Sequence, residues 1–401
     1  MPLLFPASAT GDARRLVGMR ALRGFADGLV SVLLATHLAA LGLSAAQVGA
    51  VVTATLLGSA ALTLAVGLGG GRVAERSVLL AAALLMFATG LGFAGVTVFP
   101  LLLIVAFVGT LNPSGGDVSV FLPTEQSLLA ANVGAGERTA LLARYNLAGA
   151  LFGALGGLAT GLSGLVAPES DPQPRAFLLY SGVAIAIGGL AFGLRSGRTR
   201  LAAGGGRSRL VESRSAVLRL TALFSLDSFG GGFVVDSLVA LWLFRRFELS
   251  LESIGAVFFA ARVLAAFSQL ASVRIAARIG LIRTMVYTHI PANGFLIAAA
   301  FMPTAGSAIA CLLARMALSQ MDVAPRQSYV IAVTPPAERA AAVSVTNVPR
   351  SLASALSPAA AGALLEVSDF GWPLVIGGAV KILYDLLLLA QFRSVAPDED
   401  R

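Results

Sequence analysis

The chain has 401 residues, of which 57% are apolar and only 12% are charged, and its mean hydropathy is +0.84. Soluble proteins carry about a quarter charged residues, so this composition excludes a soluble domain and predicts a protein embedded in a lipid bilayer. A single cysteine excludes a disulfide scaffold, and a net charge of +8 that comes from arginines between apolar segments argues against nucleic-acid binding.

A helix needs about twenty apolar residues to cross a bilayer. Hydropathy predicts twelve such helices, at 18–42, 45–68, 77–98, 100–132, 138–165, 176–194, 216–244, 251–274, 281–302, 304–333, 339–366 and 371–393. No apolar stretch with a cleavage site precedes the first of them, so we expect no signal peptide and a cytoplasmic N-terminus. The predicted fold is therefore an all-α, twelve-helix membrane protein.

The arginines predict the orientation of these helices. Loops that twelve crossings place inside contain Arg72, Arg76, Arg138, the run from 195 to 214, Arg274, Arg278 and Arg339. Loops near residues 43, 99 and 303, which would lie outside, contain none, although Arg245 and Arg246 form an exception after the seventh helix. By the positive-inside rule we expect both termini in the cytoplasm, with the chain in the cell's inner (plasma) membrane.

A basic, glycine-containing segment at 195–215 divides the chain into two predicted six-helix domains, 1–194 and 216–401. The two halves repeat each other at a shift of 201 residues. Gln126-Ser127, Glu137-Arg138, Asn146 and Gly161 recur as Gln327-Ser328, Glu338-Arg339, Asn347 and Gly362. Apolar matches arise easily between lipid-facing helices, but polar matches at constant spacing indicate an internal repeat.

Two parallel six-helix repeats joined by a basic cytoplasmic linker resemble the major facilitator superfamily of secondary transporters. The resemblance covers essentially the whole chain. It implies two pseudo-symmetric six-helix bundles, alternating access to a central site, and a pathway lined by helices 1, 4, 7 and 10. It also implies a transporter rather than an enzyme.

The family signature after helix 2 is only partly present. Arg72 and Arg76 match it, whereas Gly71 stands at the position of its aspartate, and the second half has Arg278 with Ala277 at that position. In the family this aspartate helps to lock the outward-open state. We expect the three arginines to act in gating without that carboxylate.

Charged pairs at the inner ends of helices 5 and 11 are further gating candidates. These pairs are Glu137-Arg138 and Glu338-Arg339. The helix 4 arginine of many proton-coupled family exporters is replaced here by Thr110. When the pairs Asp117-Val118 and Asp322-Val323 are aligned, the counterpart of this position in helix 10 is Arg315.

Acidic residues inside the predicted membrane helices are the principal candidates for function, because each costs a few kcal/mol there. Asp117 follows Asn112 and Pro113, which predict a broken or bent fourth helix. An Asp-Val pair precedes the repeated block in each half, and in this pair Asp322 of helix 10 is the repeat mate of Asp117. Five aspartates fall on the four expected pathway helices: Asp27, Asp117, Asp227, Asp236 and Asp322. We predict that they carry protons or contact the substrate together with Asn112, Arg315 and Arg326.

Other buried charges have structural alternatives. Arg23 is either a gating residue or a flank that follows the positive-inside rule, and Glu125 is either a gating residue or a structural partner of Arg326 or Arg144. Lys381 and Asp385 are one helical turn apart, and we predict that they pair with each other. His37 and His289 are isolated in the sequence, and a structural role is expected for both.

The function predicted first is proton-coupled efflux of small amphipathic or cationic compounds, because five buried acids outnumber the buried bases. A carboxylate in an apolar cavity can load and release a proton as access alternates. Alternatives are uptake of a small polar solute or organic anion by symport with protons (or Na⁺), or a non-transporting scramblase or sensor. No metal, nucleotide or cofactor motif occurs, and we expect a monomer.

Overall fold

The computed structural model describes residues 8–68, 74–113, 120–134, 137–166, 172–195, 212–335 and 338–392. Within these ranges every regular element is an α-helix. Eight helices or helix pairs there are long and apolar enough to cross a membrane, and two shorter apolar helices accompany them. The predicted all-α membrane fold is confirmed.

The described residues form two compact units. The first contains residues up to 195 together with 250–259, and the second contains 212–249 and 260–392. The linker predicted at 195–215 lies mostly outside the described residues, so its role as a domain boundary stays a prediction.

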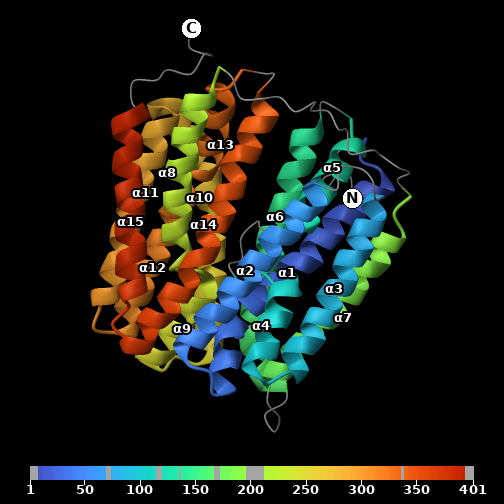
Figure 1. Cartoon of the computed structure of the whole chain (residues 1–401), viewed down its shortest axis with the longest axis vertical. Helices are drawn as coiled ribbons and strands as arrows, with labels where there is room; N and C mark the ends of the chain where they lie inside the picture. Colours follow the sequence, from blue (N-terminus) through green and yellow to red (C-terminus); the bar gives the residue numbers. More distant parts are fainter. Residues whose placement is uncertain are drawn as a thin grey trace. The chain divides into compact units, whose positions relative to one another are not determined.

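The first unit is built around a long central helix, α1, which packs against α6 and α7, while α3 packs on α7 (Figure 1). Its helices are α1 (Gly11–Ala40), α2 (Ala45–Leu68), α3 (Glu75–Gly95), α4 (Phe99–Val108), α5 (Phe121–Ala131), α6 (Arg138–Val166) and α7 (Pro172–Phe192). Small residues allow α1 and α6 to approach closely, because a Cβ at Gly28 would collide with the carbonyl oxygen of Gly153. Helix association in lipid depends on such contacts.

The second unit pairs α8 with α14 and α15, and α11 with α12 and α15. Its helices are α8 (Arg214–Gly232), α9 (Asp236–Phe247), α10 (Leu251–Ile279, whose first turns belong to the other unit), α11 (Leu281–Phe301), α12 (Ala305–Ser319), α13 (Val323–Ala332), α14 (Arg339–Val367) and α15 (Trp372–Phe392). A core that includes Phe224, Met285, Tyr329 and Tyr384 lies among α8, α11, α13 and α15. This core is the setting of the candidate site.

Each predicted helix corresponds to one observed helix or to two consecutive ones, which is consistent with twelve crossings. Three predicted helices are interrupted: 100–132 is α4 and α5, 216–244 is α8 and α9, and 304–333 is α12 and α13. The break predicted before Pro113 is confirmed, since α4 ends at Val108 and residues 109–113 are not helical. The breaks between α8 and α9 and between α12 and α13 were not predicted.

The two unexpected breaks place acidic residues at helix ends. In 216–244 the helix ends at Gly232 and resumes at Asp236, after three glycines that weaken the helical ladder. In 304–333 the helix ends at Ser319, and Asp322 lies in the turn before α13. Backbone groups released by such breaks are tolerated at membrane depth only against protein or water, so both breaks mark interior positions.

Candidate functional site

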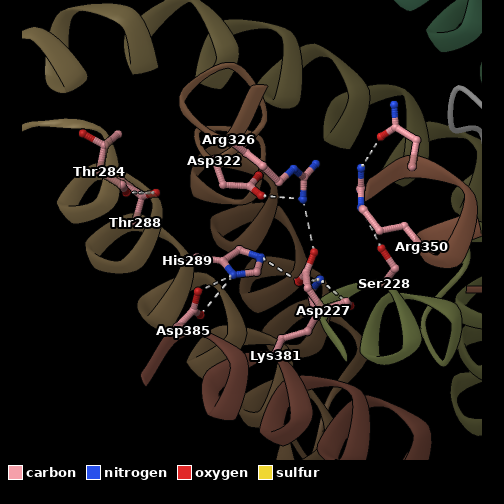
Figure 2. A network of polar contacts seen from close by, with 11 residues as sticks. Asp227, Ser228, Thr284, Thr288, His289, Asp322, Arg326, Arg350, Lys381 and Asp385 are labelled. Atoms are coloured by element: carbon pink, nitrogen blue, oxygen red, sulfur yellow. Dashed lines mark hydrogen bonds and ion pairs between the residues drawn. The ribbon is translucent and has the colours of Figure 1, made fainter. Parts of the chain in front are cut away.

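Asp227, a buried carboxylate on α8, is the centre of a network of charged side chains in the second unit (Figure 2). Lys381 of α15 donates from Nζ to its Oδ1 at 2.5 Å and to its backbone oxygen at 3.3 Å. Arg326 of α13 donates from Nη1 to its Oδ2 at 3.3 Å. Two bases from two other helices therefore balance this carboxylate, as a buried ion in a bilayer requires.

Arg326 also joins Asp227 to a second carboxylate. Its Nη1 lies 3.1 Å from Oδ2 of Asp322, one turn earlier in the chain. Its guanidinium also lies over the ring of Phe224, 5.8 Å from the ring centroid. Thus two of the acids predicted from the sequence, which are 95 residues apart in the chain, share one arginine.

His289 of α11 links a third carboxylate to this network. Its Nδ1 lies 3.0 Å from both carboxylate oxygens of Asp385, and its Nε2 lies 3.9 Å from Oδ1 of Asp227. Asp385 and His289 are both almost completely buried. Figure 2 shows the imidazole between the two carboxylates, which come from α15 and α8.

The predicted pairing of Lys381 with Asp385 is wrong. Lys381 bonds to Asp227 and Asp385 bonds to His289, because α15 presents these two positions to different neighbouring helices. His289, which is isolated in the sequence, was predicted to have only a structural role. The available signal was polar spacing on apolar helices: Lys381 and Asp385 are one turn apart, as are His289 and Asn293.

Arg350 of α14 lies beside this network without a carboxylate partner. It donates from Nε to Oγ of Ser228 at 3.1 Å and from Nη1 to Oδ1 of Asn347 at 3.4 Å. Among the described residues it forms no ion pair. It therefore adds a positive charge that no neighbouring acid neutralises by direct contact.

A second, more exposed pair forms at the start of α9. Asp236 accepts a hydrogen bond from Nη2 of Arg262 on α10 at 2.7 Å, and the two side chains are 27% and 15% exposed. Arg315 of α12 interacts electrostatically with Asp236, and its Nη1 donates to Sδ of Met316 at 3.6 Å. Within the described ranges Arg315, like Arg350, has no carboxylate in direct contact.

The first unit buries a smaller set of charges. Arg23 of α1 is 2% exposed, and its Nη1 lies 2.8 Å from Oε2 of Glu125 on α5. The Tyr145 hydroxyl donates to the same carboxylate oxygen, and Nη2 of Arg23 donates to the tyrosine oxygen at 3.2 Å. Arg23 is therefore a buried residue inside α1 rather than a loop flank, and within this unit the partner of Glu125 is Arg23.

Of the other polar residues predicted to act in the first half, two are buried and two lie outside the described residues. Asp27 is buried one turn after Arg23 and interacts with it electrostatically. Asn112 is also buried, in the segment after α4. Asp117, the acid ranked first with Asp322, and Arg72 lie outside the described residues.

Two of the acids predicted to act in gating, Glu137 and Glu338, each contact the segment that precedes the first helix of their own half. Glu137 accepts hydrogen bonds from the backbone nitrogen and the hydroxyl of Ser8. Glu338 accepts from the backbone nitrogen of Glu212 at 3.0 Å and from that of Ser213 at 3.1 Å, and also from the Ser213 hydroxyl at 2.6 Å. These repeat mates therefore tether equivalent helix starts.

The remaining gating candidates are arginines near helix ends. Arg76 lies over the ring of Phe192 at 4.6 Å, while Arg138 and Arg278 are exposed. The side chain of Arg339 lies outside the described set. No group of three His, Cys, Asp or Glu residues within the described ranges is arranged to hold a metal ion.

Comparison with known proteins identifies relatives of the whole chain. The family model described as Major Facilitator Superfamily matches residues 16–324. A membrane protein of Saccharomyces cerevisiae, described as the uncharacterized membrane protein YJR124C, is 24% identical over 430 residues, covering 96% of this chain and 95% of its own length.

Similar solved structures are transporters. The nucleoside transporter NupG superposes with a TM-score of 0.76 at 14% identity, covering 96% of this chain and 100% of its own. The inward-open xylose transporter XylE from E. coli gives 0.75 at 14% identity, covering 97% and 98%. A bacterial homologue of the human lysosomal transporter Spinster gives 0.74 at 13% identity, covering 96% of both chains. At these identities the likeness establishes the fold.

Proposed function

The chain belongs to the Major Facilitator Superfamily, and from that membership we propose that it is a proton-coupled secondary transporter that works by alternating access. It is a multi-pass membrane transporter rather than an enzyme. We further propose the inner (plasma) membrane, with both termini in the cytoplasm, from the placement of its arginines.

The observation that carries proton coupling is the sharing of Arg326 by Asp227 and Asp322. The first carboxylate belongs to α8 and the second to the break before α13, which correspond to the predicted helices 7 and 10. A proton taken up within this network changes which carboxylate holds the arginine. Because the partners belong to different helices, this change alters the contact between those helices.

Flux measurements in liposomes test the coupling. Purified protein is reconstituted, an inward or outward pH gradient is imposed, and accumulation of uridine, D-xylose, benzoate and tetraphenylphosphonium is followed. Proton coupling predicts that accumulation of a transported probe reverses direction when the gradient is reversed. Transport that is insensitive to the gradient would remove the proposal.

For the substrate, efflux of a cationic or amphipathic compound is the first candidate from the sequence, because of the five predicted buried acids. The structure supports a second candidate, an organic anion. Asp227, Asp236, Asp322 and Asp385 already have basic or imidazole partners, whereas two arginines have no carboxylate in contact within the described ranges. Those arginines are Arg315 and Arg350.

Thermal unfolding in detergent separates the two candidates. An anion that binds at Arg315 or Arg350 raises the Tm of the wild-type protein but not that of Arg315→Gln or Arg350→Gln. Arg245→Gln is the matched control, since Arg245 pairs with Asp369 through Nε at 2.9 Å in an exposed position. Stabilisation by tetraphenylphosphonium alone supports cation export instead, and gradient-driven accumulation of any probe excludes a scramblase or sensor.

A further inference from the structure

We propose that His289 of α11 and Asp385 of α15 form the proton-binding site of this protein. The inference rests on the proton coupling proposed above and names the group that carries the proton. Neither residue belongs to the four helices expected from the sequence to line the pathway. Their position, bonding and charge environment all support the assignment.

The bonding of the imidazole leaves one nitrogen for a second proton. A neutral imidazole has one N–H donor and one acceptor nitrogen, whereas the protonated ring has two donors. Nδ1 lies 3.0 Å from both oxygens of Asp385, so this pair already shares a hydrogen. Nε2 lies 3.9 Å from Oδ1 of Asp227, where a lone pair would face a carboxylate. A proton on Nε2 turns that repulsion into attraction.

The charge of the directly connected network also favours one more proton. Its permanent charges are three carboxylates, on Asp227, Asp322 and Asp385, against two bases, Arg326 and Lys381. With a neutral imidazole the sum is −1, and with an imidazolium it is zero. Uncompensated charge is costly at membrane depth, so protonation of His289 neutralises a buried cluster.

The elements packed against α11 supply the other groups that influence this titration. On α15, α13 and α12 and in the turn before α13 they are Lys381, Tyr384, Asp385, Arg326, Tyr329, Arg315, Cys311 and Asp322. From α8, Asp227 lies 3.9 Å from the imidazole. The Tyr384 ring lies edge-on to the imidazole at 6.1 Å. Arg315 acts electrostatically on Asp236 and Asp227, and Arg350 adds positive charge from α14. The cationic groups Lys381, Arg326, Arg315 and Arg350 oppose protonation, whereas the three aspartates of the network favour it.

The proposed step is a simple proton transfer. A proton from the aqueous side open to the site binds the lone pair of Nε2, and on release the same N–H bond breaks and the proton returns to water. While the imidazolium is present, three cationic groups surround Asp227. Arg326 can then leave Asp227 and remain with Asp322 alone, which loosens the contact of α13 with α8.

Nitrogen NMR of the full-length protein tests the site without a known substrate. The sequence contains only two histidines, His37 and His289, so ring-¹⁵N-histidine labelling gives two imidazoles, assigned with His37→Gln. His37 supplies a second imidazole for comparison, in a different setting, because its Nε2 lies 3.1 Å from the backbone oxygen of Phe93. The measurement is a titration between about pH 5 and pH 8.

The proposal predicts that Nε2 of His289 gains a proton as the pH is lowered through this range. In Asp385→Asn the imidazolium signal of His289 should be absent at the pH where the wild-type protein shows it. A His289 that keeps one protonation state throughout, or that titrates identically in Asp385→Asn, would overturn the proposal.

A flux assay keeps this proposal separate from the proposed function. His289→Gln should lower pH-driven accumulation of a transported probe at least tenfold, whereas His37→Gln should leave that accumulation as it is in the wild-type protein. Gradient-driven flux with a His289 that does not titrate overturns only the site. A titrating His289 without gradient-driven flux overturns the coupling instead.

Discussion

In the first unit Arg23 and Glu125 form one ion pair closed by Tyr145, whereas in the second unit Asp227 is shared by Lys381 and Arg326 and approached by His289. In the first arrangement one positive and one negative side chain pair directly between α1 and α5, and Asp27 acts on Arg23 electrostatically. The second distributes three acids and their partners over α8, α11, α13 and α15, with an uneven count. Within the described residues, therefore, the first unit has a self-contained ion pair, Arg23–Glu125. The second has a network in which one proton can change which residues are paired.

The largest expected loss of stability comes from breaking the ion pair between Arg23 and Glu125. Glu125→Leu leaves Arg23 buried without its partner, and we expect a loss of about 3–5 kcal/mol of stability, measured as a large fall in Tm in detergent. The double variant with Arg23→Leu should recover most of it, because two apolar side chains replace two charges. A Glu125→Leu variant with the Tm of the wild-type protein would show that the pair does not stabilise the fold.

Glu338→Gln should cause the next largest loss of stability. Glu338 is buried and accepts three hydrogen bonds from the segment before α8, so loss of its charge is expected to cost about 1.5–3 kcal/mol. Glu137→Gln, at the equivalent but less buried position, is the matched variant and should cost less. If both variants keep their Tm while transport rates change, the two acids act in gating, as the sequence suggested.

Asp322→Asn tests the network through coupling rather than through stability. Arg326 retains Asp227, and the amide has the shape of the acid, so Tm should change little. pH-driven accumulation should fall about tenfold, equivalent to about 1.4 kcal/mol, while exchange at equal pH continues. Asp369→Asn, at an exposed ion pair, is the control. Undiminished accumulation in Asp322→Asn would contradict a role for the shared arginine.

The smallest effect is expected at Asp236 and Arg262. This pair is partly exposed, so Arg262→Gln should change stability by about 1 kcal/mol or less in a thermal-unfolding assay. It thereby distinguishes an ordinary interhelical pair from the buried network around Asp227. A fall as large as that of Glu125→Leu would place Asp236 with the buried charges.

Several elements of the site could be recognised from the sequence because the signal is local. Asp227, Asp322 and Arg326 are charged residues in apolar helices, and the repeat relates Asp322 to Asp117. The break of the fourth helix followed from Pro113 and its neighbouring glycines, because proline removes a backbone donor. The breaks at Gly232 and Ser319 escaped prediction, since hydropathy continues across them.

The partners of these charges could not be predicted in the same way. Lys381 meets Asp227 across 154 residues, and Arg326 meets it across 99. Helical spacing made Lys381 and Asp385 look like a pair, but α15 turns them towards α8 and α11 respectively. Spacing along one helix shows which side chains share a face, not which neighbour that face meets.

Composition and hydropathy are properties of the chain taken in order, and they were enough to predict an all-α, multi-pass membrane transporter. The balance of its buried charges is different, because it depends on which helices pack together. An ion pair forms between side chains that meet in space, and a buried ion is stable only with such a partner. Packing thus brought His289 and Lys381 into a network that the order of residues alone did not reveal.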